Sequence, residues 1–242
     1  MNFDWFTNPI IIEQAAILRI DIVALAWFVL CWFGYARFAD RNYHRRLNLI
    51  RIMDEMRARW MHRMLERENR ITDATLIGNI LRSIYFFAST TILILIGLFT
   101  ILGAGREGMQ IVHDIPFTLG ASPLMWEIKI SLLMVIFVYA FFKLTWSLRQ
   151  YNYACIIVGA APPAAEVQAH HYEYAERAGK LVGNAGRHFN MGLRAYYFGM
   201  AAISWFLNGW IFILVTAWIV WVVYRREFRS HTVNNLLTID DA

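Results

Sequence analysis

The chain alternates long apolar blocks with segments that are rich in charged residues. Three blocks, at 20–38, 80–103 and 124–148, are almost wholly apolar. Each has roughly the 20 residues that a helix needs to cross about 30 Å of hydrocarbon at 1.5 Å per residue. No block shows the period-2 alternation of a membrane strand. The pattern therefore predicts an all-α fold, a multi-span helical membrane protein that forms a single membrane domain over 1–242.

The last apolar region, 195–224, allows two interpretations. It is too long for one untilted span, and the sequence "WFLNGW" interrupts it. Asn208-Gly209 is a turn signal, and Trp205 and Trp210 flank it as membrane-interface residues do. Two short spans, 192–208 and 209–224, would bring the total to five spans. One long, tilted or kinked helix would bring it to four.

The distribution of basic residues favours five spans. From Arg37 to Arg82 there are eleven arginines, whereas 104–123 has one, and three arginines follow the last apolar region. Loops rich in Lys and Arg stay in the cytoplasm. We therefore expect cytoplasmic segments at 39–79 and 149–191, an outer amino terminus and a cytoplasmic carboxyl terminus.

The first cytoplasmic segment carries an amphipathic helical pattern. Large apolar residues recur at helical spacing, at Leu49, Ile52, Met53, Met56, Trp60 and Met64. A second face carries Arg59, Arg63, Arg67 and Arg70. Near-surface arginines attract anionic lipid headgroups. The four arginines are candidates for binding lipid or a partner, or they form a solvated face that only sets the topology.

The sequence "FFASTT", residues 86–91, places small and hydroxylated residues inside the second apolar block. Such hydroxyls can bond to carbonyls three or four residues earlier, and small residues let helices approach closely. Alternatively, Ser89, Thr90 and Thr91 line a solute path, with Phe86 and Phe87 as its constriction. Both interpretations, pore lining and helix packing, stay open.

Charged residues near the span ends, namely Arg19, Asp21, Glu127 and Lys129, fall at the expected outer boundary. We expect them to form interfacial ion pairs, since charges at membrane boundaries usually pair. The net charge of +5 fits orientation in a membrane rather than binding of nucleic acid. No histidine lies in a span, and no P-loop, HExxH, GxSxG or CxxC pattern occurs. We therefore expect no catalytic residues, metal site or cofactor.

Four segments carry a family resemblance: "RARWMHRMLERENRITDA", "FFASTTILILIGL", "FKLTWSLRQYNYACIIVGAAP" and "FNMGLRAYYFGMAAISWF". Their order and spacing, over 37–228, resemble the domain-of-unknown-function membrane family five-ninety-nine. The resemblance implies a multi-span helical protein of bacteria, hence of the inner membrane, and brings no catalytic residues with it. The family has a proline after the "WF" of the last region, where this chain has Asn208-Gly209.

Two hypotheses of function follow. The first is an oligomeric channel or passive conduit lined by the second span. The second is a structural or accessory subunit of a larger membrane complex. An enzyme acting on a phosphorylated lipid at the membrane surface is a third and weaker hypothesis. The expected partners are a bilayer with anionic headgroups and either further copies of the chain or another membrane protein.

Overall fold

The computed structural model describes residues 9–42, 48–105 and 123–229, and these are almost entirely helical. The main helices are α1 (Pro9–Asn42), α2 (Leu49–Leu65), α3 (Ile71–Gly103), α5 (Pro123–Ala160), α6 (His171–Ile203) and α7 (Gly209–Phe228). Two short 3-10 helices, Ala164–Glu166 and Ser204–Phe206, lie before and after α6. No strand occurs within these ranges, so the all-α prediction is confirmed for the part that the structure describes.

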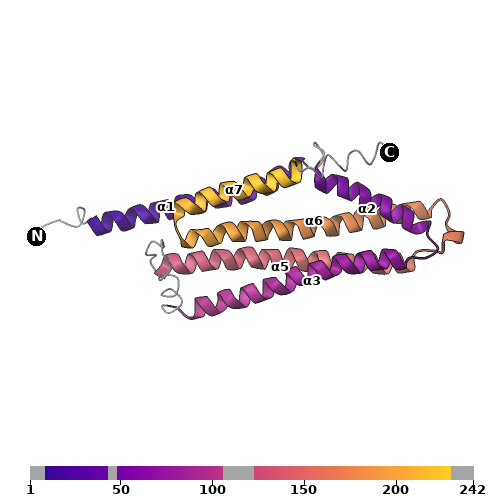
Figure 1. Ribbon diagram of the computed structural model, residues 1–242, viewed down its shortest axis with the longest axis horizontal. Coiled ribbons are helices and arrows are strands. Elements are labelled where there is room, and N and C mark those ends of the chain that lie inside the picture. Colours follow the sequence, from indigo (N-terminus) through magenta and orange to yellow (C-terminus); the bar gives the residue numbers. More distant parts are fainter. Residues whose placement is uncertain (1–8, 43–47, 106–122, 230–242) are drawn as a thin grey trace, which may run out of the picture.

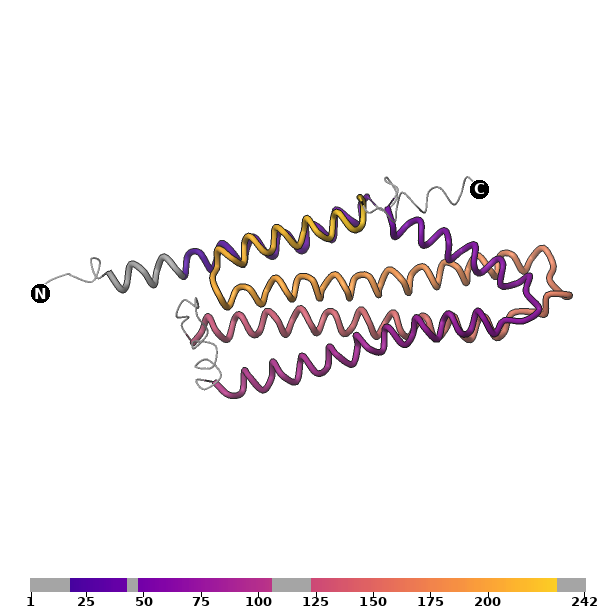
Figure 2. Tube along the Cα trace, in the orientation of Figure 1, coloured from indigo at the N-terminus to yellow at the C-terminus, as the bar shows by residue number. Residues whose placement is uncertain are grey.

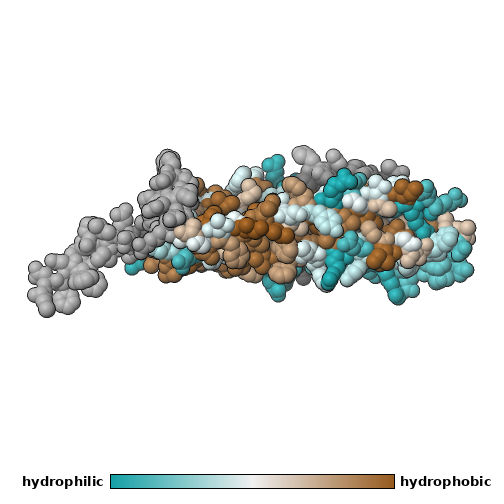
Figure 3. Space-filling view, turned by 90° about the horizontal axis from the view of Figure 1, so that it is seen from below, coloured by the Kyte–Doolittle hydropathy of each residue, from teal (hydrophilic) through white to brown (hydrophobic). Residues whose placement is uncertain are grey.

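The helices form an elongated bundle with two halves (Figure 1). α3, α5 and α6 run along its length, whereas α1 and α7 lie alongside one half and α2 along the other. Figure 3 shows apolar residues gathered over the half with α1 and α7 and hydrophilic residues towards the half with α2. Three segments are long and apolar enough to cross a membrane: Leu18–Asn42, Ile71–Gly103 and Pro123–Ala160. The structure is therefore compatible with a helical membrane protein, and the bundle has an apolar and a polar half.

Each half has its own hydrophobic core. The core of the apolar half contains Phe28, Phe198, Trp205 and Phe212, all fully buried. The core of the polar half joins α2, α3, α5 and α6 through Met61, Ile77, Tyr151, Val182 and their neighbours. Because α5 and α6 contribute to both cores, they hold the two halves together.

Glycines on α6 allow its neighbours to approach closely. A Cβ atom at Gly179 would lie 2.8 Å from the backbone Cα of Ala58 in α2. A Cβ atom at Gly192 would lie 2.8 Å from Cγ of Leu144 in α5. Since real Cβ atoms essentially never come this close to other atoms, side chains at these positions would push α2 and α5 away from α6.

The region 195–224 folds as two antiparallel helices. α6 ends at Ile203, and α7 begins at Gly209 and returns along α1 (Figure 2). Asn208 caps α7, because its side chain accepts a 2.9 Å hydrogen bond from the backbone N–H of Trp210. A Cβ atom at Gly209 would lie 2.8 Å from Cγ2 of Ile20. The turn at Asn208-Gly209 is confirmed, and a single long helix is excluded.

Several helices extend beyond the predicted apolar blocks. α3 begins at Ile71 rather than near 80, and α5 continues to Ala160 rather than ending near 148. The extensions pack in the second core, where burial of one face stabilises a helix outside an apolar environment. Pro162 and Pro163 lie between α5 and α6, as expected for residues that cannot continue a helix.

Candidate functional site

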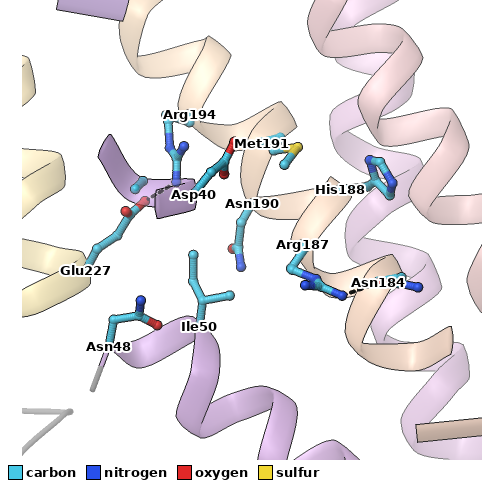
Figure 4. A pocket seen from close by; sticks show the side chains of 11 residues that line it. Asp40, Asn48, Ile50, Asn184, Arg187, His188, Asn190, Met191, Arg194 and Glu227 are labelled. Atoms are coloured by element: carbon cyan, nitrogen blue, oxygen red, sulfur yellow. Dashed lines mark hydrogen bonds and ion pairs between the residues drawn. The ribbon is translucent and has the colours of Figure 1, made fainter. Parts of the chain in front are cut away.

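A pocket of about 370 Å³ lies where the two halves of the bundle meet. It is formed by the ends of α1 and α7, the start of α2 and the middle of α6 (Figure 4). We call it the junction pocket. Its lining consists of Ala39, Asp40, Asn48, Ile50, Asn184, Arg187, His188, Asn190, Met191, Arg194 and Glu227. Most of these side chains can donate or accept hydrogen bonds, so the junction pocket suits a polar ligand.

One wall of the junction pocket is a buried charge cluster. Arg194 is only 7% exposed, and its Nη2 donates a 2.8 Å hydrogen bond to Oε1 of Glu227. The Tyr35 hydroxyl donates to Oε2 of the same carboxylate at 2.7 Å, and the Arg194 guanidinium lies 5.1 Å from the centre of the Tyr35 ring. Nε of Arg194 is buried and has no hydrogen-bond partner among the described residues. The cluster joins α1, α6 and α7 and leaves the buried Nε–H of Arg194 without an acceptor among the described residues.

A second set of charges joins α2 to α6 beside the junction pocket. Arg187 donates to the side-chain oxygen of Asn184, and its Nε lies 3.8 Å from Oδ2 of Asp54. Arg57 donates a 2.9 Å hydrogen bond to the other Asp54 oxygen. Asp54 fits between these arginines because it faces Gly183, where a Cβ atom would lie 3.1 Å from Oδ1. Two guanidinium groups therefore share one carboxylate beside the junction pocket.

His188 also lines the junction pocket, on the side of α5. Burial lowers the pKa of this imidazole below its ordinary value of 6.5, and the positive charges of Lys143 and Arg187 lower the pKa further. Nδ1 of His188 is buried and has no hydrogen-bond partner within the described ranges. The ring is therefore neutral at pH 7 and adds no fixed charge to the lining.

A second pocket, of about 190 Å³, lies on the other side of the Arg194–Glu227 pair. It shares Ile50, Asn190, Arg194 and Glu227 with the junction pocket. Its remaining lining is mostly apolar, with two further arginines: Leu49, Met53, Arg57, Leu193, Tyr197, Val223 and Arg226. The two spaces therefore adjoin each other and have the Arg194–Glu227 pair in common.

The predicted pore-lining or packing residues do not share one side of α3. Thr91 is fully buried, donates to the backbone oxygen of Phe87 at 2.7 Å and lies 2.6 Å from the Tyr196 hydroxyl. The Thr90 hydroxyl donates to the backbone oxygen of Phe86 at 2.8 Å. The Phe86 side chain is 66% exposed, and Ser89 is also exposed. Within one chain, Thr91 is therefore a packing residue, whereas Phe86 and Ser89 face outwards.

The predicted stripe of four arginines is divided. Arg59 and Arg63 are exposed on α2, but this helix ends at Leu65. Arg67 follows the helix and forms a 2.5 Å ion pair with the fully buried Asp73. The expectation of one continuous face is therefore wrong beyond Leu65, because the helix that would have carried it ends there.

Arg70, the fourth arginine of the predicted stripe, has a structural role in a turn. It precedes α3 and donates to the backbone oxygens of Ala161, at 2.7 Å, and Pro162. These carbonyls lie directly after α5, whose last carbonyls have no partner within the helix. Arg70 therefore ties the α2–α3 turn to the end of α5.

The charges at the expected outer boundary form one buried pair. Nζ of Lys129 lies 3.6 Å from Oδ2 of Asp21 and donates a 3.0 Å hydrogen bond to the backbone oxygen of Trp205. The indole N–H of Trp205 donates to Oδ1 of Asp21 at 2.7 Å. Arg19 and Glu127 are exposed instead. Of the expected ion pairs, the structure contains the one between Asp21 and Lys129, and this pair fixes the α6–α7 turn to α1 and α5.

Sequence reasoning did not single out the junction pocket. Arg194 stands inside the largely apolar run "MGLRAYYFGM", and Glu227 is the single acidic residue in "RREFR". A charged residue in an apolar helix is costly unless it is paired. That signal marks both residues, but their pairing across the fold cannot be read from a chain in which they are 33 positions apart.

Among the described residues, no group of three or more His, Cys, Asp or Glu side chains is placed to hold a metal ion. The two cysteines, Cys31 and Cys155, are both free.

Taken together, these features define an all-helical bundle with three helices apolar enough to span a membrane and a candidate binding site at the junction of its two cores. The chain belongs to the family described as "Protein of unknown function, DUF599", whose model matches residues 23–232. The predicted family resemblance is therefore confirmed. No curated protein and no solved structure matches the chain.

Proposed function

We propose that this protein is a structural or accessory component of an assembly in the bacterial inner membrane. In this proposal five helices cross the bilayer, with the amino terminus outside, and the half that contains α2 extends into the cytoplasm. Support comes from the basic residues at the end of α7, Arg225, Arg226 and Arg229, and from the polar surface of the α2 half (Figure 3).

The observation that carries the proposal is the uncovered outer face of α3. Only 17% of the most apolar stretch of α3 is buried within the chain, compared with 39% for α5. Phe86, Ser89, Leu93, Gly97 and Thr100 follow one another along this face at helical spacing, and all five are exposed. Small residues allow close helix contact in a bilayer, where packing and hydrogen bonds drive association.

A second copy of this chain is the partner that we propose for the α3 face. No atom lies within 4 Å of a Cβ placed on Gly97, so the backbone of another helix can approach there. Two copies of the same face would bring Ser89 and Thr100 of each chain towards the other. Their hydroxyls could bond across the contact as well as within each helix.

A conduit between copies is the second candidate function. Large side chains such as Phe28, Phe198 and Trp205 fill the core of the apolar half, so a path would run between chains rather than through one. The outward position of Ser89 and Phe86 favours this candidate, since these are the residues that would face such a path. In that case the second span would line the path and Phe86 would narrow it.

Arg59 and Arg63 are proposed as contacts for an acidic partner rather than for headgroups. Both lie towards the end of α2 that points away from α1 and α7 (Figure 1). In the proposed topology that end is distant from the bilayer surface. Exposed arginines there add electrostatic attraction that salt would screen.

The test uses single cysteines at Ser89 and Gly97 in a Cys31→Ser, Cys155→Ser background. Assembly through α3 predicts oxidative cross-linking between chains in native membranes, without labelling by a water-soluble maleimide. A conduit predicts labelling at Ser89. Thr91→Cys, buried within the chain, and Leu214→Cys, 69% exposed on α7, serve as controls that should neither cross-link nor label.

Absence of both cross-linking and labelling at Ser89 and Gly97 would contradict both candidate functions. If the cysteines cross-link only to a protein of another mass, the partner of the α3 face is that protein and not a second copy of this chain. The proposed accessory role would then still hold.

A further inference from the structure

We propose that the junction pocket binds a phosphate group through Arg187, Asn190 and Arg194. The phosphate is carried by a phospholipid headgroup or is free in the cytoplasm, and the chemistry of recognition is the same in both cases. The inference goes beyond the proposed assembly role, because it concerns a different surface of the molecule.

Arg194 is the residue that points most directly to a missing ligand. It is 7% exposed and lines the junction pocket, and its buried Nε has no acceptor among the described residues. A cationic N–H group that is buried away from water costs free energy unless a hydrogen-bond acceptor replaces the water. Glu227 bonds to Nη2 of the same guanidinium and not to Nε, so the buried Nε–H calls for an additional oxygen atom.

Arg187 and Asn190 place further donors on the same wall of α6 (Figure 4). The side chain of Arg187 is 37% exposed, although it also contacts Asn184 and Asp54. The planar fork of a guanidinium matches two phosphate oxygens, and an amide supplies two N–H groups. Donors from two arginines and one asparagine therefore suit a tetrahedral anion better than a flat carboxylate.

The place and size of the pocket favour a phospholipid as the source of the phosphate. The junction pocket lies at the ends of α1 and α7, between the two halves of the bundle. Along the long axis the surface changes from apolar on one half to polar on the other (Figure 3). Its volume of about 370 Å³ exceeds what a bare phosphate fills and lies within the range of ligand sites. The adjoining second pocket has apolar lining at Leu49, Met53, Leu193 and Val223, which could accept the glycerol and the first acyl carbons.

Two carboxylates, Asp40 and Glu227, also line the junction pocket. One of them allows a test in which the affinity for phosphate should rise. The charge of Glu227 is balanced by Arg194, whereas Asp40 is exposed and repels an anion. Removing the Asp40 charge should therefore tighten binding of a phosphate, a gain that loss of folding cannot imitate.

The experiment measures binding to the full chain, delipidated in detergent, by isothermal titration calorimetry. The probes are dihexanoylphosphatidylglycerol, inorganic phosphate and dihexanoylglycerol, which lacks the phosphate. We expect the phospholipid to bind and dihexanoylglycerol not to bind. Inorganic phosphate that binds as tightly as the phospholipid identifies free phosphate as the source, and weaker binding identifies the lipid.

Variants then test two of the proposed donors and the nearby Asp40 carboxylate. Arg187→Gln and Asn190→Leu should each weaken binding of the phospholipid by about tenfold, as expected for loss of a charge-assisted or buried hydrogen bond. Asp40→Asn should tighten it several-fold. Arg177→Gln is the matched control, because Arg177 is 76% exposed on the same helix and pairs with Glu173.

Three results would overturn the proposal. One is that neither phosphate-bearing probe binds, and another is that dihexanoylglycerol binds as tightly as the phospholipid. The third is that Arg187→Gln and Asn190→Leu both keep the affinity of the unchanged protein.

Discussion

At the scale of single residues, the pairing of Asp21 with Lys129 matters most for the apolar half. Both side chains are almost fully buried, and Trp205 bonds to each of them. Burying two charges is expensive, and the cost is recovered only where the pair is close and its remaining groups are hydrogen-bonded. Here three helices meet at one charged contact, so the pair specifies how the α6–α7 turn docks.

We predict that Lys129→Ala lowers the free energy of unfolding by about 3–5 kcal/mol, because it leaves the Asp21 carboxylate buried without a cation. Replacing both partners, in Asp21→Leu with Lys129→Met, should recover most of the loss. Equilibrium unfolding in mixed detergent micelles measures both effects. Glu127→Gln, an exposed neighbour, is the control and should change stability by less than about 0.5 kcal/mol. Equal stability of Lys129→Ala and the unchanged protein would show that the pair contributes nothing.

At the scale of helices, the close packing of α2 against α6 depends on three glycines of α6. Gly179, Gly183 and Gly186 face Ala58, Asp54 and Arg57 in that order. Because these glycines have no side chains, the α2 backbone can lie against α6, and Asp54 can reach Arg187. The close contact thus builds one wall of the junction pocket, because it positions the charges that surround Arg187.

We predict that Gly179→Ala destabilises the protein by about 1–3 kcal/mol, since the new methyl group would overlap the Ala58 backbone and the helices must separate. Gly78→Ala is the control. No atom lies within 4 Å of a Cβ at Gly78, so alanine should leave stability unchanged or raise it by up to about 1 kcal/mol through its higher helix propensity. Denaturation of the two variants side by side provides the comparison. A neutral effect at Gly179 would mean that α2 does not pack as tightly as the structure indicates.

At the scale of the whole molecule, the two halves have surfaces suited to two environments. Exposed aromatic and aliphatic residues cover the half with α1 and α7, among them Phe33, Leu93, Leu214 and Trp218. Exposed ion pairs such as Arg177–Glu173 and Lys180–Glu176 lie on the α2 half. The change of surface along the long axis is consistent with a bundle that is embedded in the bilayer at one end and solvated at the other.

We predict that a reporter fused after Ala242 is active only in the cytoplasm, and that one inserted between Gly105 and Pro123 is active only outside. The reason is that three arginines lie in the last turn of α7 and directly after it, whereas 104–123 has a single arginine. Paired alkaline phosphatase and green fluorescent protein fusions at both positions provide the measurement. Alkaline phosphatase activity at the carboxyl terminus would contradict the five-span topology, and the assembly proposal would then need a different orientation.

Features that depend on neighbouring residues in the chain were predictable from the sequence. The helices follow from apolar blocks and helical spacing, the turn from Asn208-Gly209, and the break after α5 from Pro162 and Pro163. The boundaries were less predictable. α3 and α5 continue past the apolar blocks because their extensions pack in a second core, which composition along the chain does not report.

The tertiary structure decided which residues meet. Tyr35 and Glu227 are 192 positions apart, and Asp21 and Trp205 are 184 apart, yet each pair shares a hydrogen bond. It also decided that Thr91 faces Tyr196 while Ser89 faces outwards, although the two stand within one short segment. Local patterns specify that a helix forms, because its hydrogen bonds join residues four apart. Which face of the helix is buried, and which charges are paired, depends on helices brought from elsewhere in the chain, and so the junction pocket exists only in the folded bundle.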